Sequence, residues 1–171
     1  MDVNQSALEQ ARINYPHRHY RVGCGENLPY GKGYFDQVIA NVSLPYMNIP
    51  KTLREVRRVL KPGGMIVFSL HLPSFTWSEL KITRRLRAAI FRICVMLNGT
   101  YFHLTGRVLD LFGKAESFQT QRGMRIAIVR AGFSEIVFQR EGARYIVRAI
   151  APATTANQAL NYSPGRALPQ C

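Results

Sequence analysis

The sequence predicts an α/β fold with a mostly parallel sheet and an antiparallel hairpin at its C-terminal end. Two apolar segments of strand length, Phe35–Ala40 and Met65–Leu70, flank a helical segment, and this order is typical of parallel sheets. Two more strand-like segments, Ser134–Gln139 and Arg144–Ile150, are joined around Glu141-Gly142 and predict the hairpin. The 171 residues are enough for one domain with its own core, which we place at residues 1–150.

The N-terminal segment predicts a helix followed by a short strand. Ser6 and Glu9 have the spacing of a capping box, and Pro16 ends the helix that they begin. Tyr20–Val22 is a strand candidate, closed by the glycines of Gly23-Cys24-Gly25. A helix, a short strand and a glycine turn therefore precede the first apolar strand.

Three further helices are expected. The first starts near Pro50, and Lys61–Gly64 stops it before the second apolar strand. The second is long and basic, Ser78–Asn98, with Gly99 as its expected C-terminal stop. The third spans Thr120–Ala131, and the glycine that follows ends it. Residues 151–171 lack an apolar period and are expected to form a loose tail.

The long basic helix carries one apolar stripe, and most of its cations lie elsewhere on its surface. The stripe is formed by Ile82, Leu86, Ile90, Ile93 and Leu97. The favoured interpretation is an ordinary amphipathic helix whose arginine face is solvated. A lid, or a surface that faces an anion or a membrane, is the alternative.

The charge balance favours an anionic partner. The chain has 23 basic and 10 acidic residues, a formal net charge of +13. Most of this excess falls in residues 76–150, which hold 13 basic and 5 acidic side chains. Nucleic acid, a membrane surface and an acidic substrate are the partner classes that such an excess indicates.

Several functional classes lack their motifs. The three cysteines, Cys24, Cys94 and Cys171, form no CxxC pair, and the four histidines have no metal-ligand spacing, so no metal site is expected. The sequence has no phosphate-binding loop, no complete dinucleotide fingerprint and no GxSxG elbow. Because the start is polar, no secretory signal peptide is expected, and no apolar segment of the sequence is long enough to span a bilayer. A cytoplasmic location is therefore expected.

Four ordered pieces resemble one enzyme family. They are Asp2-x-Asn4-x-x-x-Leu8-x-x-Ala11; Gly23-x-x-Glu26-x-Leu28-Pro29-Tyr30 with Tyr34-Phe35-Asp36-x-Val38; Leu53-x-Glu55-x-x-Arg58-Val59-Leu60-Lys61-Pro62-Gly63-Gly64; and Ala131-Gly132-Phe133. In this order and spacing the chain resembles the class I S-adenosylmethionine-dependent methyltransferases, of the broad type 11 kind. The resemblance implies a Rossmann-like methyltransferase fold with S-adenosylmethionine as cofactor.

The resemblance also implies which residues hold the cofactor. Asp2 would accept hydrogen bonds from the ribose hydroxyls, and Gly23, Cys24, Gly25 and Glu26 would pass the adenine. Many relatives carry an acidic residue where Cys24 stands, so this adenine contact differs here. A third set follows the fourth strand of the family and would lie near the methionine part; it consists of Asn41, Val42 and Ser43.

On the acceptor side, Ser69 and His71 follow the fifth strand of the family. Methyl transfer from a sulfonium needs alignment and exclusion of water more than it needs catalytic side chains. A general base is required only where the acceptor must lose a proton, and His71 is the candidate. A polar residue that merely closes the strand is the alternative role of His71.

The resemblance begins partway into the family's pattern. The first strand, its glycine-rich turn and the next helix would precede Asp2. We therefore expect an N-terminally truncated domain. In the family's sheet, strands one and two separate the third strand from the fourth. In a complete chain, Tyr20–Val22 would have to pair beside the fourth strand, or a partner would have to complete the sheet.

Three functional hypotheses follow. The first is methyl transfer to a small-molecule acceptor, with residues 76–115 as a variable helical insertion or lid. The second is a non-catalytic remnant or subunit of a methyltransferase. The third is an RNA-directed methyltransferase or basic RNA-binding module, but no recognised RNA-binding motif is present. The acceptor, the methylated atom and the oligomeric state are not specified by the sequence.

Overall fold

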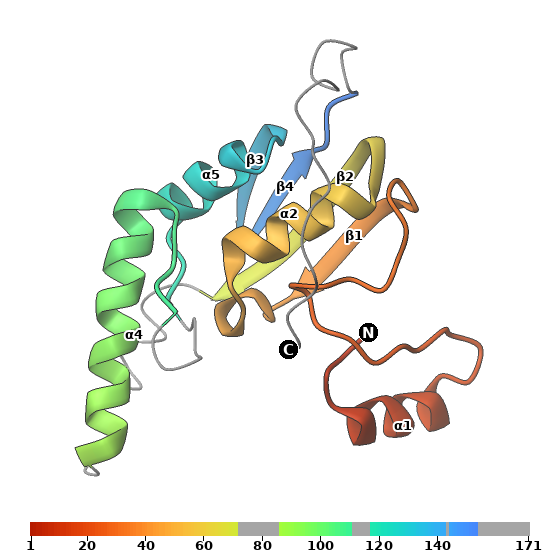
Figure 1. Cartoon of the computed structure of the whole chain (residues 1–171), viewed down its shortest axis with the longest axis horizontal. Helices are drawn as coiled ribbons and strands as arrows, with labels where there is room; N and C mark the ends of the chain where they lie inside the picture. The colour runs from red at the N-terminus through yellow and green to blue at the C-terminus, as the bar shows by residue number, and fades with distance from the viewer. Residues whose placement is uncertain (72–85, 111–116, 143, 154–171) are drawn as a thin grey trace, which may run out of the picture.

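The structure, a computed structural model, describes residues 1–71, 86–110, 117–142 and 144–153 (Figure 1). In chain order the elements are α1 (Gln5–Asn14), β1 (Phe35–Asn41), the 3-10 turn η1 (Leu44–Tyr46), α2 (Ile49–Val59), β2 (Leu60–His71), α4 (Leu86–Thr105), α5 (Gln121–Arg130), β3 (Ser134–Glu141) and β4 (Arg144–Ile150). The α/β class predicted from the sequence is confirmed. No helix within these described ranges is long and apolar enough to cross a membrane.

The sheet has four strands in the order β1-β2-β4-β3. β1 and β2 pair in parallel, with Val38 opposite Ile66 and Ala40 opposite Phe68. β4 pairs antiparallel with both β2 and β3, so the predicted C-terminal hairpin is confirmed. β1 forms one edge of this sheet, and its outer side faces the N-terminal segment.

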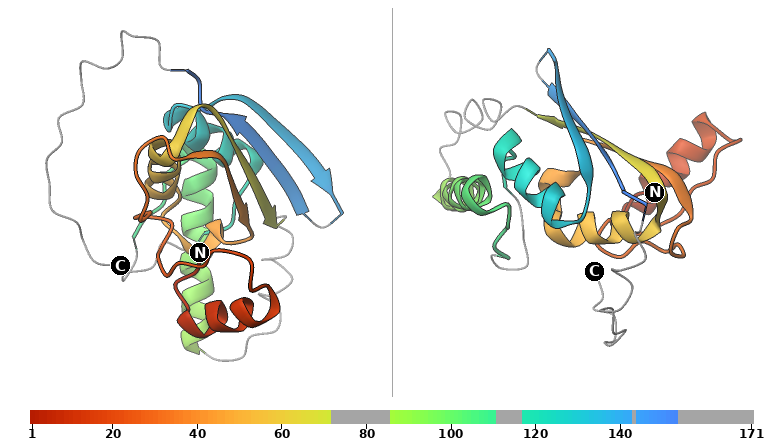
Figure 2. Two further views of the ribbon diagram at one scale, coloured as in Figure 1. Left: turned by 90° about the vertical axis from the view of Figure 1, so that its right-hand side faces the viewer. Right: turned by 90° about the horizontal axis from the view of Figure 1, so that it is seen from above.

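One face of the sheet carries the hydrophobic core. Along β2, Ile66, Phe68 and Leu70 are fully buried and alternate with half-buried residues, as the two-residue period of a strand requires. α2 and α5 cover this face (Figure 2), and Leu53 and Ile128 pack into it from these helices. On the opposite face, Ile39 of β1 is 68% exposed.

α2 and β2 follow each other without a loop. Asn48 caps α2 by accepting a hydrogen bond from the Lys51 N–H, and Pro50 lies in the first turn as predicted. The predicted stop at Lys61–Gly64 is a strand instead, because β2 begins at Leu60, which pairs with Phe35. The backbone of Gly63, at φ +79°, adopts the left-handed region that glycine tolerates.

Two predictions for the N-terminal segment are wrong. The cap of α1 is Asn4, whose side chain accepts from the Ala7 N–H, and not Ser6. Tyr20–Val22 forms no regular strand; Val22 makes one isolated parallel bridge with Asp2. Among the described residues the pairing does not extend beyond this bridge, so no strand forms. Tyr20–Val22 does not pair with β1.

α4 differs from its predicted bounds. It runs through Gly99 and ends at Thr105, before Gly106 at φ +64°. Gly99 lies inside the helix against Phe118, where a larger side chain would not fit, so this glycine serves packing and not a helix stop. Residues 78–85 of the predicted helix, and 154–171 of the predicted tail, lie outside the described residues.

α4 packs on α5 through small residues. A Cβ at Gly123 would lie 2.6 Å from the carbonyl oxygen of Phe102, so the two helices are in backbone contact here. α5 is capped by Thr120 and followed by Gly132 at φ +81°, as the sequence predicts. Figure 1 shows α4 at the outer side of the molecule, beyond α5.

Candidate functional site

A cavity of about 700 Å³ lies along the free edge of β1. Its walls come from the N-terminal segment, the loop before β1, β1 itself and the start of α2. Five of the predicted cofactor residues line it: Asp2, Gly23, Gly25, Asn41 and Ser43. These residues come from three separate stretches of the sequence, and the fold brings them to one place.

The isolated bridge positions the first of these stretches. The Gly23 N–H donates to the carbonyl oxygen of Asp2 at 3.1 Å, so both residues lie side by side at the cavity wall. The Asp2 carboxylate accepts from the Asn4 N–H at 2.9 Å and is exposed. One carboxylate oxygen therefore orders the turn before α1, and the carboxylate keeps further acceptor capacity.

The carboxyl end of β1 supplies the second wall. Asn41 lies opposite Ser69 of β2, and the Val42 N–H donates to the carbonyl oxygen of Ser69 at 2.8 Å. Val42 has a φ of +55°, which is an outlier for a β-branched residue. Such strain is held only where the surrounding structure fixes it, and it is enriched at functional sites.

Thr52 of α2 adds a buried polar group to the same cavity. Its side chain is 4% exposed, and its hydroxyl has no hydrogen-bond partner among the described residues. An unpaired hydroxyl away from water costs about 1–3 kcal/mol. Thr52 was not among the residues predicted from the sequence, because a threonine inside an amphipathic helix carries no motif of its own.

Two charged residues of α2 hold the loop that closes the cavity. Glu55 accepts from the Leu28 N–H at 3.0 Å, and Arg58 donates to the carbonyl oxygens of Leu28 and Tyr30 at 2.9 and 2.7 Å. Leu28 and Tyr30 both line the cavity. The hydrogen bond from Arg58 holds the pKa of Glu55 below its ordinary value, against the opposing effect of burial. Glu55 and Arg58 belong to a motif that the sequence shares with the family, but their role in holding this loop was not predicted.

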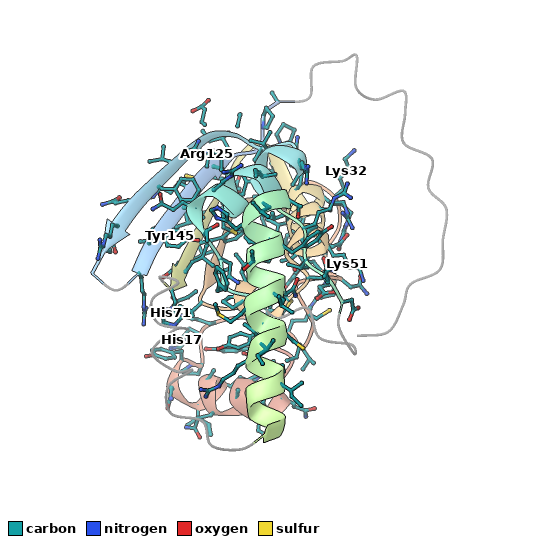
Figure 3. The ribbon with its side chains drawn as sticks, turned by 90° about the vertical axis from the view of Figure 1, so that its left-hand side faces the viewer. His17, Lys32, Lys51, His71, Arg125 and Tyr145 are labelled. Carbon is teal, nitrogen blue, oxygen red and sulfur yellow. The ribbon has the colours of Figure 1, made fainter. Side chains whose placement is uncertain are left out.

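The other predicted residues lie outside the cavity wall. Glu26 accepts from the Asn48 N–H at 2.7 Å at the start of α2, with Lys51 Nζ 4.0 Å away. The backbone of Cys24 forms an isolated antiparallel β-bridge with Asn27, and Val42 lies between the lining residues Asn41 and Ser43. His71, which is labelled in Figure 3, lies at the end of β2 opposite Arg144. It is not among the lining residues.

A family model described as "Methyltransferase domain" matches residues 1–68. This stretch contains residues 1–3, the glycine turn, β1 and α2, which supply most of the cavity wall. This matched stretch is similar to the class I S-adenosylmethionine-dependent methyltransferases. The family resemblance and the Rossmann-like fold expected from the sequence are thereby confirmed, and the family's cofactor is S-adenosylmethionine.

Two curated methyltransferases each match less than half of the chain. An uncharacterized methyltransferase of Synechocystis sp. is 40% identical over 88 residues, which are 48% of this chain and 42% of the relative. A malonyl-[acyl-carrier protein] O-methyltransferase of Erwinia pyrifoliae is 37% identical over 70 residues, 40% of this chain and 27% of the relative. The chain thus spans less than half the length of these curated methyltransferases.

Solved methyltransferase structures share the fold over most of the chain. A S-adenosylmethionine-dependent methyltransferase of Methanosarcina mazei superimposes with a TM-score of 0.59 at 14% identity, covering 90% of this chain and 81% of that structure. One of Thermotoga maritima, titled a possible histamine N-methyltransferase, gives 0.59 at 18% identity, covering 87% and 70%. At these identities the likeness concerns the fold alone.

Proposed function

We propose that the chain binds S-adenosylmethionine in the cavity along β1 and takes part in methyl transfer to a small-molecule acceptor. The observation that supports this most directly is the meeting of Asp2, Gly23, Gly25, Asn41 and Ser43 at one cavity. These residues offer a carboxylate, backbone amides, a side-chain amide and a hydroxyl. That donor and acceptor set suits a ligand with ribose hydroxyls and an amino-acid end.

Asp2 is proposed as the ribose ligand. A carboxylate can accept from two neighbouring hydroxyls at once, and charge-assisted hydrogen bonds are the stronger kind. Its contact with the Asn4 N–H fixes the turn and so holds the carboxylate at the wall. Gly23 and Gly25 carry no side chain that would fill the cavity, and position 25 has no room for one, since a Cβ there would lie 2.7 Å from Met47 Sδ.

The polar groups at the end of β1 are proposed to hold the methionine part. Asn41 can donate and accept through its amide, and Ser43 and the unpaired Thr52 hydroxyl add two further groups. Apolar side chains such as Leu28, Val38 and Phe68 form the rest of the wall and exclude water. When bound, S-adenosylmethionine supplies a methyl group on a positively charged sulfur. Cys24, Glu26 and Val42 are proposed to act through the backbone that they share with the lining residues.

His71 remains the proposed general base, on the acceptor side. It is the last residue of β2, two residues after Ser69, which pairs with Asn41 of the cavity wall. It would take a proton only from an acceptor that must lose one. A small molecule is the proposed acceptor class, since most of the excess of basic charge lies outside residues 1–71, where the cavity is built.

The decisive experiment is calorimetric titration of S-adenosylmethionine and S-adenosylhomocysteine into purified Met1–Cys171. We expect micromolar binding that weakens at least tenfold in Asp2→Asn. Glu9→Gln is the matched control, because Glu9 is an exposed carboxylate on α1 that does not line the cavity. A folded chain that binds neither compound would instead support the non-catalytic remnant or subunit.

A further inference from the structure

From Ile90 to Leu104 the solvent-facing side of α4 is largely apolar. Ile90, Ile93, Leu97 and Leu104 are 54%, 55%, 62% and 58% exposed. Their spacing of three, four and seven residues places them in one line on the helix surface. The sequence favoured the opposite arrangement, in which the arginine face is solvated and the apolar stripe is covered.

The domain occupies the other side of α4. Asn98 and Phe102 are buried, Gly99 lies against Phe118, and the carbonyl oxygen of Phe102 approaches Gly123 of α5. The Asn98 side chain exchanges hydrogen bonds with the backbone of Leu109 at 2.7 and 3.0 Å. These contacts fix the rotation of α4 about its own axis. Because the buried side of the helix is set in this way, the apolar stripe must face solvent. Figure 3 shows α4 in front of the sheet and the other helices.

The charge of this region is of one sign. Between Glu79 and Asp110 the sequence contains Lys81, Arg84, Arg85, Arg87, Arg92 and Arg107 and no acidic residue. Pairing of this stripe with a second copy would bring two such segments together without any compensating charge. An anionic surface complements the same charge.

The stripe also lacks polar groups that a specific protein partner could use. Thr100, an exposed polar residue within its length, gives its hydroxyl to the carbonyl oxygen of Met96 at 2.9 Å. An exposed line of aliphatic side chains in a segment rich in basic residues is the pattern of helices that lie in the interface of a bilayer. We propose that α4 docks the protein on an anionic lipid surface, with Ile90, Ile93, Leu97 and Leu104 inserted at the headgroup boundary.

The test is co-flotation of the full chain with vesicles of equal parts phosphatidylcholine and phosphatidylglycerol, beside vesicles of phosphatidylcholine alone. We expect binding to the anionic vesicles that falls as salt is added, and at least tenfold weaker binding to the neutral ones. The double variant Ile93→Gln/Leu97→Gln should lose at least tenfold in binding. Ile13→Gln is the matched control, because Ile13 is an aliphatic residue of α1 that is 74% exposed.

Circular dichroism would establish that each variant is folded, as expected for positions more than half exposed. Wild-type binding that the double variant retains would overturn the proposal, as would a folded wild type that ignores anionic vesicles. Light scattering on the same samples would identify a second copy as the occupant if the wild type is a dimer and the double variant a monomer. Cofactor titration is a separate readout, so the failure of either proposal is distinguishable from that of the other.

Discussion

Arg58 donates two hydrogen bonds to Glu55, from Nε to Oε1 at 2.9 Å and from Nη2 to Oε2 at 2.6 Å. The two residues lie about one helical turn apart on α2. The side chain of Glu55 is 22% exposed and that of Arg58 is 32% exposed, so both are mostly buried. Because each partner also bonds the backbone of the 28–30 loop, the pair connects the helix to the cavity wall.

Removal of either partner should destabilise the fold. Glu55→Ala leaves Arg58 and the Leu28 N–H without the carboxylate, and we expect a loss of about 1–3 kcal/mol in the free energy of unfolding. Arg57→Ala, on the same helix, removes a surface contact to the Pro152 carbonyl oxygen and should cost less than about 0.5 kcal/mol. Urea unfolding of both variants measures the difference; equal losses would contradict the assigned role.

The same pair predicts a loss of stability in acid. The pKa of Glu55 is lowered from 4.5, chiefly by the hydrogen bond from Arg58, so the folded state favours the charged form. This contribution is present above pH 4.5 and disappears as the pH falls through the lower, folded-state pKa. Unfolding of wild type and Glu55→Gln should therefore differ at neutral pH and converge in acid. A difference that persists unchanged well below pH 4.5 would refute it.

The unpaired hydroxyl of Thr52 makes a prediction that separates stability from binding. Thr52→Val removes a buried hydroxyl at nearly constant volume and should raise the stability of the free chain by about 1 kcal/mol. The same variant should weaken S-adenosylmethionine binding in the titration. Tyr145→Phe is the matched control, because its buried hydroxyl is also unpaired among the described residues but does not line the cavity. Unchanged binding in Thr52→Val would show that this hydroxyl serves no ligand.

The contact between α4 and α5 predicts a glycine that cannot be replaced. Alanine is a better helix former than glycine by about 1 kcal/mol, yet Gly123→Ala should destabilise by about 1–3 kcal/mol. The reason is the clash of its Cβ with the Phe102 carbonyl oxygen, which belongs to backbone and cannot move aside easily. Gly31→Ala, where no atom lies within 4 Å, should be nearly neutral. Thermal unfolding of the two variants gives the comparison.

Local sequence signals predicted most of the sheet. The apolar runs that became β1 and β2 and the Glu141-Gly142 turn each specify a strand or a reversal without help from the rest of the chain. β2 is longer than predicted because Lys61–Gly64 carries signals that end helices, while its pairing with Phe35 is a contact between distant residues. The orientation of α4 was missed for the same reason, since it is fixed by Gly99 and Gly123 fitting against rings of other segments.

The candidate site was only partly accessible to sequence. Family motifs indicated Asp2, Gly23 and Asn41, and these lie together at the cavity. No motif indicates Thr52, because its hydroxyl matters through burial and the lack of a partner. The motif also grouped Glu26 with the glycines, whereas the fold engages its carboxylate at the start of α2.

The parts of the cavity differ in how firmly they are attached. The wall made by α2 and β2 belongs to the core, whereas α1 contributes one buried residue, Leu8, and the Asp2–Val22 contact is a single bridge. Segments with so few buried contacts open at a small fraction of the global unfolding free energy. Amide hydrogens of residues 2–22 should thus exchange with solvent long before those of β2. A ligand held by Asp2 would slow that exchange. Binding would then be detected as slower amide exchange of the N-terminal segment, without a change in its average structure.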